Sequence, residues 1–325
     1  MSSSLSVLIV NYNGAEYIED TILSLFGALD NKNIDVEILV LDNNSVDGSI
    51  DILKALENKN GLPLKNYFSD DNMGFAKGCN YLADKATKDV ILLLNNDTKT
   101  LSIDNLADLL IDGYFSKNDV IGTVNILNQD LTRQNNVFTY PTKIKLILEL
   151  FLLKHFIVKM RTHVFKPNSI REDYKNTYFS GCVMFLPREL YKTFNGFDER
   201  FYFYHEECDL FMRVEASDRK VDKIYLEDKI IHFGGGGKEI SEFSFVAYYV
   251  NLFRLFQYNN LMSNNTLNKL FKLSFSMRKL ISKLGFRYKY SPFSTTYKAH
   301  SKRTPLEVLE LHDCVLKKLN NIEEL

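Results

Sequence analysis

The chain has 325 residues, of which 45% are hydrophobic and 13% aromatic, so it can bury a large core and is predicted to form about two domains. The formal net charge is −1, and no stretch of 18 or more residues is apolar and free of charges, which argues against a membrane-spanning helix. The four cysteines, Cys79, Cys182, Cys208 and Cys314, form no C-x-x-C pair, which argues against a disulfide framework or zinc ribbon and favours reduced thiols in the cytoplasm.

The first hundred residues alternate short apolar runs with helical segments. The N-terminus lacks a basic region, so we expect a first strand there and not a signal peptide. The apolar runs are 5–10, 36–41 and 90–94, and the helical segments are 16–29, 48–56 and 75–86. This alternation predicts βαβ units on a mostly parallel sheet. Ligands of such sheets bind beyond the carboxyl ends of the strands.

Each of these apolar runs ends in a polar cluster. The clusters are Asn11–Gly14, Asp42–Ser45 and Asn95–Thr98. Any one of them is also typical of a turn or a helix N-cap, because Asn, Asp, Ser and Gly are common at both. Three clusters at the same edge of one sheet favour a shared ligand.

An acid-rich segment, GFDERFYFYHEECDLFMR, occupies residues 196–213. Mutual repulsion and partial burial are expected to raise the pKa of at least one carboxyl there, which suits a general base. The alternative is a solvated helix N-terminus, where acidic residues are favoured.

Two later segments bear on attachment to membranes. Residues 144–160, IKLILELFLLKHFIVKM, are mostly apolar but carry charges, which suits either a buried helix or a membrane-surface helix. Residues 246–325 are predicted to form a small, basic helical appendage, with helical spacing at 267–284 and 306–319.

The segment from Phe243 to Thr304 contains no Asp or Glu but eleven basic residues. These are Arg254, Lys269, Lys272, Arg278, Lys279, Lys283, Arg287, Lys289, Lys298, Lys302 and Arg303. The expected partner is an anionic membrane surface. A solvated face or a subunit interface is the alternative, and no recognised nucleic-acid-binding motif accompanies the charge.

Five ordered motifs together resemble family 2 glycosyltransferases of the GT-A fold, and within them the bacterial rhamnosyltransferase-like branch. They are VLIVNYNG, LVLDNNSVDGS, DNMGFAKGCN, LLLNNDT, and SGCVMFLPRELYKTFNGFDERFYFYHEECDLFMR with a downstream HFGGGG. The resemblance covers residues 5–260. It implies an α/β GT-A catalytic domain over 1–245, with a nucleotide-sugar half (1–100) and an acceptor half (101–245), followed by the helical region 246–325.

The resemblance also implies which residues bind the donor, a nucleoside-diphosphate sugar. Those implied are Asn11, Asn13, Asp42, Asn72, Gly74, Asn80 and Asn96. Gly74 and Gly78 independently permit close approach of backbone where a helix begins, and helix N-termini favour phosphate. A G-x-x-x-G spacing is equally compatible with helix packing.

The metal motif of the family, often Asp-x-Asp, reads Asn95-Asn96-Asp97 here. Asp97 is therefore the implied ligand of a divalent cation, Mg²⁺ or Mn²⁺, whose shell phosphate oxygens and water complete. His232 matches a downstream histidine and is a second candidate metal ligand, although a lone histidine is also commonly structural. The glycines that follow, Gly234–Gly237, suit either a phosphate cradle or a hinge.

At the acid-rich segment the family usually reads Glu-Asp-x-Asp-Leu, with the second acid as catalytic base. The corresponding residue is Glu207, with Glu206 and Asp209 as the nearest rivals. The implied reaction is a single inverting displacement, in which the hydroxyl of a saccharide or lipid-linked saccharide attacks the anomeric carbon.

Two other functions fit parts of the pattern. A dinucleotide-dependent oxidoreductase would suit a doubly wound sheet, but the first turn reads NYNGAE and lacks G-x-G-x-x-G. A catalytically silent protein that binds a sugar nucleotide or a membrane remains compatible, because Asn95 and Glu207 depart from the pattern of the family.

Overall fold

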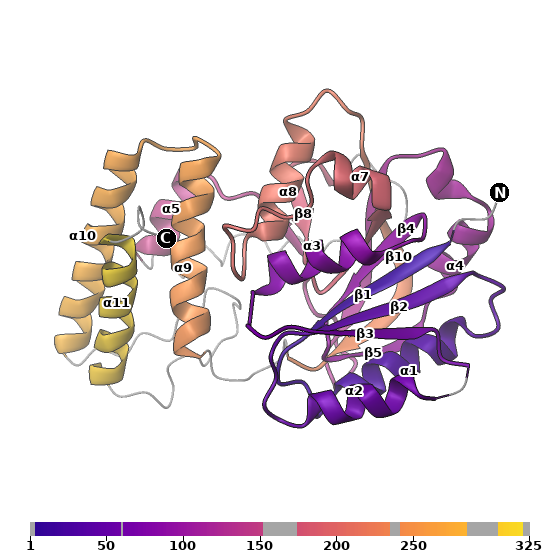
Figure 1. Cartoon of the computed structure of the whole chain (residues 1–325). Helices are drawn as coiled ribbons and strands as arrows, with labels where there is room; N and C mark the ends of the chain where they lie inside the picture. Colours follow the sequence, from indigo (N-terminus) through magenta and orange to yellow (C-terminus); the bar gives the residue numbers. More distant parts are fainter. Residues whose placement is uncertain (1–3, 60, 152–173, 235–240, 285–304, 321–325) are drawn as a thin grey trace. The chain divides into compact units, whose positions relative to one another are not determined.

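The computed structural model describes residues 4–59, 61–151, 174–234, 241–284 and 305–320. The chain divides into two compact units (Figure 1). The first unit is drawn from Met1–Thr139, Lys166–Tyr202 and Glu206–Gly236. The second, the helical unit, is drawn from Tyr140–Phe165, Phe203–His205 and Gly237–Leu325.

The first unit is built on an eight-stranded sheet with the order β3-β2-β1-β4-β9-β6-β10-β5. The strands are β1 (Leu5–Asn11), β2 (Val36–Asp42), β3 (Leu64–Phe68), β4 (Val90–Leu94), β5 (Thr98–Ser102), β6 (Val120–Leu127), β9 (Val183–Pro187) and β10 (Asp222–His232). Four of the seven neighbouring pairs are parallel: β1–β2, β2–β3, β1–β4 and β6–β10. The predicted mostly parallel α/β sheet is thus confirmed.

Helices and short elements complete this unit. They are α1 (Ile18–Leu29), α2 (Ser49–Glu57), α3 (Phe75–Lys85), α4 (Asp104–Ile111), α7 (Arg188–Thr193), α8 (Glu206–Glu215), the 3₁₀ helix η1 (Tyr114–Ser116) and a separate ribbon of β7 (Val137–Thr139) with β8 (Thr177–Phe179). The predicted helices at 16–29, 48–56 and 75–86 differ from α1, α2 and α3 by at most two residues at either end.

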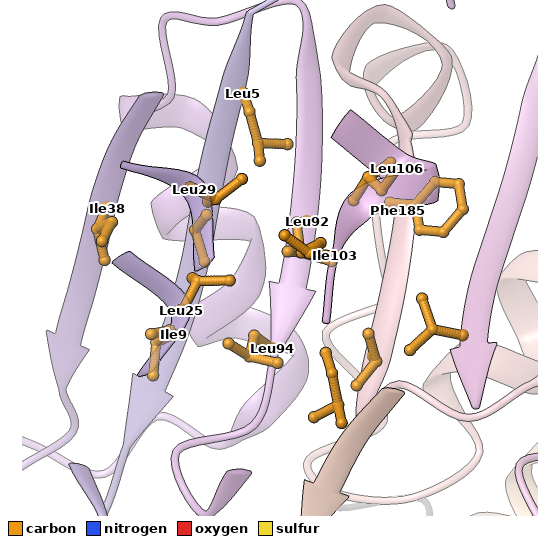
Figure 2. Packing of buried hydrophobic residues seen from close by; sticks show 14 of the residues in the cluster. Leu5, Ile9, Leu25, Leu29, Ile38, Leu92, Leu94, Ile103, Leu106 and Phe185 are labelled. Atoms are coloured by element: carbon orange, nitrogen blue, oxygen red, sulfur yellow. The ribbon is translucent and has the colours of Figure 1, made fainter. Parts of the chain in front are cut away.

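The core of the first unit explains why the central strands are apolar on both faces. All five residues of β4 are buried, and Leu92 and Leu94 pack with residues of α1 such as Leu25 (Figure 2). Burying one such side chain stabilises the fold by about 1.5–3 kcal/mol. On the opposite face of the sheet, Gly78 lets α3 approach closely, because a Cβ there would lie 3.0 Å from a methyl of Val10.

The topology brings several strand ends to one edge of the sheet. β9 is antiparallel to both β4 and β6, so β6 runs in the same direction as β4. β10 is parallel to β6, so the carboxyl end of β10 lies at the same edge as those of β1, β2 and β4. This sheet edge is where the candidate site lies.

The helical unit contains α5 (Lys143–Leu150), α9 (Glu242–Tyr258), α10 (Asn264–Lys283) and α11 (Pro305–Asn320). Its core is rich in aromatic side chains, among them Phe253, Phe271 and Phe275. The predicted helices at 267–284 and 306–319 correspond to α10 and α11. Within the described residues, no helix is both long and apolar enough to cross a membrane.

Part of the basic segment is structural, because Arg254 and Arg278 are buried. Arg278 is fully buried, and its guanidinium donates to the backbone oxygens of Glu149 and Leu150 (2.7 and 2.9 Å) and to the hydroxyl of Tyr249 (2.9 Å). Arg278 thereby satisfies carbonyls at the C-terminal end of α5. Arg254 is also buried. Arg287, Lys289, Lys298, Lys302, Arg303 and residues 152–160 lie outside the described residues.

Candidate active site

The centre of the sheet edge is a buried hydrogen-bond network between the ends of β1 and β2. Asn11 and Asp42 are register partners, and the amide of Asn11 donates to Asp42 Oδ2 at 2.8 Å. Both side chains are buried. Asp42 Oδ1 accepts from the backbone N–H of Ser45 at 2.9 Å. Two residues from separate polar clusters therefore hold each other in fixed positions.

Asn13 lies at the rim of this network. It is exposed and has a φ of 50°, a left-handed conformation that Asn tolerates better than most residues. Its backbone N–H donates to Ser45 Oγ at 2.8 Å, and its side chain accepts from the N–H of Val46 at 2.9 Å. These bonds join the turn after β1 to the turn after β2.

A second set of amides fixes the turn before α3. The amide of Asn43 donates to Asn72 Oδ1 at 2.8 Å, and Asn72 Oδ1 also accepts from the N–H of Gly74 at 3.0 Å. Gly74 has a φ of 86°, and a Cβ there would lie 2.5 Å from the backbone oxygen of Tyr202, so glycine is required. Asn43 was not among the predicted site residues, although its place directly after Asp42 was the available signal.

The turn after β4 joins the same edge. The amide of Asn96 donates to Asn11 Oδ1 at 2.8 Å, so Asn96 continues the Asn11–Asp42 network. The hydroxyl of Thr21 accepts from the N–H of Thr98 (3.1 Å) and lies 2.9 Å from the backbone oxygen of Asn96, to which it can donate. The turn that carries Asp97 is therefore held from both sides.

At this edge, the carboxylate of Asp97 lies against the imidazole of His232. Asp97 Oδ1 lies 3.2 Å from His232 Nε2, and His232 Nδ1 lies 3.1 Å from Gln134 Oε1, an acceptor. The side-chain oxygen of Gln134 can only accept, so Nδ1 is the donor in that contact, while Nε2 faces Asp97. Asn95, the departure from the motif, places its amide 3.4 Å from the same Nε2. Gln134 was not predicted, because nothing local in the sequence links it to His232.

The pair also fits a divalent cation. Burial acts to lower the pKa of His232, but contacts with Cys182 and Asp97 outweigh it and hold the pKa well above its usual value. Loss of the Nε2 proton would leave a nitrogen lone pair beside a carboxylate oxygen. These two atoms could serve as two of the ligands of Mg²⁺ or Mn²⁺. No group of three or more His, Cys, Asp or Glu side chains with metal-binding geometry occurs among the described residues, so donor phosphates and water would complete the shell.

Gly234 packs directly against the carboxylate of Asp97. A Cβ at this position would lie 2.2 Å from Asp97 Oδ2, so any larger residue would displace the carboxylate. The backbone N–H of Phe233 donates to the backbone oxygen of Asp97 at 2.9 Å. Of the four predicted cradle glycines, Gly235, Gly236 and Gly237 lie outside the described residues.

The other acids gather at the first turn of α8. Glu206 is only 3% exposed, and Glu207 is partly buried within hydrogen-bonding range of it. Burial, together with the negative charge of Glu207, holds the pKa of Glu206 well above its usual value. Oε2 of Glu206 receives no hydrogen bond from the part of the chain that the structure describes. Protonation of Glu206 therefore relieves both its burial as a charge and its repulsion with Glu207.

The backbone that leads into α8 is strained. Tyr204 and His205 have φ values of 74° and 73°, a conformation that costs about 1–3 kcal/mol for residues with a side chain. Burial lowers the pKa of His205 to about 4, so its imidazole is neutral at pH 7. Strain of this kind is typical of functional sites, where it sets the direction of neighbouring side chains.

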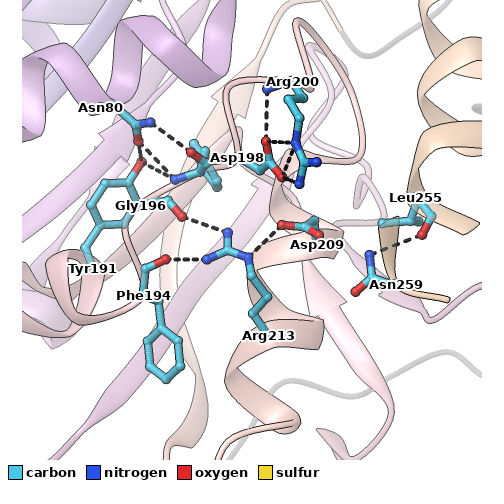
Figure 3. Close-up of polar contacts among 11 residues, drawn as sticks. Asn80, Tyr191, Phe194, Gly196, Asp198, Arg200, Asp209, Arg213, Leu255 and Asn259 are labelled. Carbon is cyan, nitrogen blue, oxygen red and sulfur yellow. Dashed lines mark hydrogen bonds and ion pairs between the residues drawn. The ribbon is translucent and has the colours of Figure 1, made fainter. Parts of the chain in front are cut away.

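Asp209, the third acid of this turn, is engaged in a structural contact. Its carboxylate accepts from Arg213 Nε at 2.7 Å, and Arg213 also donates to the backbone oxygens of Phe194 and Gly196 (Figure 3). Asp209 is 3% exposed. This pair fixes α8 to the turn before it, so the Asp209 carboxylate is engaged in a structural ion pair.

Asn80 contacts the same turn (Figure 3). Its side-chain oxygen accepts from the hydroxyl of Tyr191 (2.7 Å) and the N–H of Phe197 (2.9 Å). Its amide donates to the backbone oxygen of Phe197 and to Glu199. The described contacts of Asn80 are therefore those of a residue that orders the acid-rich segment.

Comparisons with known proteins give a consistent result. Residues 6–192 match the family model described as glycosyl transferase family 2. An uncharacterized protein from Haemophilus influenzae is 26% identical over a stretch that covers 42% of this chain and 81% of that protein.

Solved structures share the fold. S. aureus TarS 1–349 in complex with UDP-GlcNAc has a TM-score of 0.52 at 15% identity, with 98% of this chain and 81% of that chain covered. The mannosyltransferase PcManGT from Pyrobaculum calidifontis, in complex with GDP-Man and Mn²⁺, has a TM-score of 0.51 at 12% identity, with 99% and 87% covered. GalNAc-T7 with UDP, GalNAc and Mn²⁺ has a TM-score of 0.54 at 14% identity, and this chain spans 58% of its length.

Proposed function

Because the chain belongs to glycosyl transferase family 2, we propose that it transfers a sugar from a nucleoside-diphosphate sugar to an acceptor hydroxyl, with inversion at the anomeric carbon. The observation that carries the proposal is the pair of Asp97 and His232, 3.2 Å apart, at the same sheet edge as the Asn11–Asp42 network. The Asp97–His232 pair suits a metal-bound diphosphate, and the Asn11–Asp42 network suits a nucleoside.

Few charged side chains would bind the donor. Asp97 and His232 would hold Mg²⁺ or Mn²⁺, which when bound neutralises the charge of the leaving diphosphate. Asn11, Asp42 and Asn96 would orient the nucleoside, because their mutual hydrogen bonds leave little freedom to lose on binding. Asn13, Asn72 and Gly74 would lie along the same donor.

On the acceptor side, Glu207 is the proposed base. It would take the proton of the acceptor hydroxyl while the oxygen forms a bond to the anomeric carbon and the bond to the diphosphate breaks on the opposite face. A positioned base contributes about 10²- to 10⁴-fold to such a step. Glu206 would modulate this base, because the two carboxyls share an environment that favours a single negative charge.

The substrates are proposed from the motif resemblance. The sugar would be rhamnose or another hexose, and the acceptor a saccharide or lipid-linked saccharide used to assemble a surface polysaccharide or glycan. The reaction would take place in the cytoplasm, at the surface of a membrane. The exposed basic and apolar residues of the helical unit support that location.

A panel of UDP-, GDP- and dTDP-sugars tests the proposal, with thermal shift for binding and nucleotide release for turnover, each in Mn²⁺, Mg²⁺ and EDTA. We expect one donor to raise the melting temperature only with the cation and to be hydrolysed or transferred. Binding without release of nucleotide under any condition would instead support a catalytically silent sugar-nucleotide-binding protein. No binding to any donor would contradict both.

A further inference from the structure

Helix α10 presents an exposed face that is divided into an apolar edge and a basic edge. The apolar edge consists of Leu273, Leu280 and Leu284, which directly follows the helix, and these side chains are 61%, 58% and 65% exposed. Large apolar side chains at such exposure are ordinary when they are scattered, but these three lie along one line of the helix.

The spacing of the leucines defines that line. Leu273, Leu280 and Leu284 are separated by seven and four residues, so they recur on one side of the helix and span about 17 Å along its axis. The opposite side of α10 is buried by Leu267, Phe271, Phe275 and Arg278. The apolar edge is therefore not the side that forms the core of the helical unit.

The basic edge lies beside the leucines. Lys269, Lys272 and Lys283 are exposed, and none has an ion pair among the described residues. α10 contains no Asp or Glu. Lys279, by contrast, pairs with Asp313 of α11, so it belongs to the contact between the two helices.

We propose that α10 lies flat on an anionic bilayer, with Leu273, Leu280 and Leu284 at the acyl boundary and Lys269, Lys272 and Lys283 among the headgroups. Long lysine side chains can extend from such a helix toward anionic headgroups while the apolar side chains enter the interface. A second copy of this chain is a poorer occupant, because a symmetric contact would oppose the same lysines to each other. The inference deepens the proposed location at a membrane but does not depend on glycosyl transfer.

The chain contains no tryptophan, so one introduced tryptophan reports on its own surroundings. In Leu280→Trp we expect the emission to shift to the blue with vesicles of 30% phosphatidylglycerol and to be quenched by brominated lipid. The matched control is Ile111→Trp on α4 of the first unit, 45% exposed, whose emission should not change. Unchanged emission of the Leu280→Trp protein, or equal quenching in both proteins, would overturn the proposal.

Co-sedimentation of the full chain with the same vesicles separates the two edges. Lys269→Gln, Lys272→Gln and Lys283→Gln combined should weaken binding about 100-fold and remove most of its salt dependence. The control, Lys59→Gln, Lys117→Gln and Lys220→Gln, makes the same change of charge at exposed positions of the first unit and should bind as the wild type does.

The apolar edge is tested by Leu273→Gln, Leu280→Gln and Leu284→Gln, which keep good helix formers at exposed positions and should weaken vesicle binding at least about tenfold. The melting temperature establishes that each variant is folded. Donor turnover measured without vesicles should be unchanged, which separates failure of this inference from failure of the proposed function. If the leucine variant loses self-association instead of vesicle binding, the face is an interface between copies and the proposal is wrong.

Discussion

The polar groups of the sheet edge are satisfied by hydrogen bonds, whereas those of the first turn of α8 are crowded carboxyls. At the sheet edge, Asn11, Asp42 and Asn96 satisfy one another through hydrogen bonds of 2.8 Å. At α8, Glu206 and Glu207 are close together, and the burial of Glu206 raises its pKa. The first arrangement fixes geometry, and the second increases affinity for a proton.

Under the proposed function, this difference would separate donor binding from proton transfer within one unit. A network that is already satisfied offers a rigid surface to a ligand but has little tendency to change its protonation. A crowded acid pair has the reverse properties, because two charges in a poorly solvated place cannot both persist. We therefore expect substitutions at the sheet edge to affect donor affinity and substitutions at α8 to affect turnover.

The largest expected effect is that of Glu207→Gln. Loss of the proposed base should lower kcat by about 10²- to 10⁴-fold, while the affinity for the donor, measured by calorimetry, stays within a few-fold of the wild type. The matched control is Glu206→Gln, which should retain far more activity. If Glu206→Gln is the inactive variant, the role of base passes to Glu206.

Asp97→Ala, at the sheet edge, should affect donor binding and not proton transfer. Removal of the only carboxylate of the Asp97–His232 pair should weaken donor binding in Mn²⁺ about 10- to 100-fold, because even outer-shell groups at metal sites contribute that much. Titration of donor in Mn²⁺ and in EDTA measures the effect. Equal affinity of wild type and variant in both conditions would mean that the site works without a metal.

Asp209→Asn tests whether the third acid is structural. The variant keeps a hydrogen-bonding partner for Arg213 but loses the charge, so unfolding should become easier by about 1.5–3 kcal/mol. Turnover should remain within a few-fold of the wild type, as measured below the melting temperature. A loss of activity as large as that of Glu207→Gln, in a protein of unchanged stability, would return Asp209 to the candidates for the base.

The smallest effect is a pH-dependent gain of stability in Glu206→Gln. Because the pKa of Glu206 is raised in the folded state, the wild type is most stable below the pKa of the unfolded chain and loses stability as pH rises toward the folded pKa. Gln mimics the protonated form and lacks this loss. Between these two pKa values the variant should gain at most about 1.4 kcal/mol per pH unit relative to the wild type. Thermal unfolding at pH 4, 6 and 8 measures this, and a constant difference would show that Glu206 has an ordinary pKa.

Periodicity made much of the structure of the first hundred residues predictable. The apolar runs at 5–10, 36–41 and 90–94 became β1, β2 and β4, because a strand that is buried on both faces needs apolar residues throughout. β5 was not predicted because buried threonines alternate in it with Lys99 and Leu101, whereas β9 was not predicted although its five residues are all buried, as in β4. Parallel strand direction then predicted that the polar clusters would meet at one edge, and Asn96 does contact Asn11 there.

Single residues were harder to assign than segments. Charge density predicted the basic segment as a whole, but not that Arg278 is buried under α5 while Lys269, Lys272 and Lys283 are exposed. A basic side chain looks the same in the sequence whether it meets carbonyl oxygens or solvent. Only the packing of α5 against α10 distinguishes the two.

The fold class, the polar clusters at one sheet edge and the cluster of acids could be predicted from the sequence, because all three follow from local patterns of two to four residues. Which members of each cluster contact one another depends on the tertiary structure. It placed Gln134 behind His232, 98 positions away in the chain, and turned Asn80 toward the acid-rich segment, 117 positions away. Contacts of that range depend on how strands far apart in the chain are ordered in the sheet, and no local pattern contains that information.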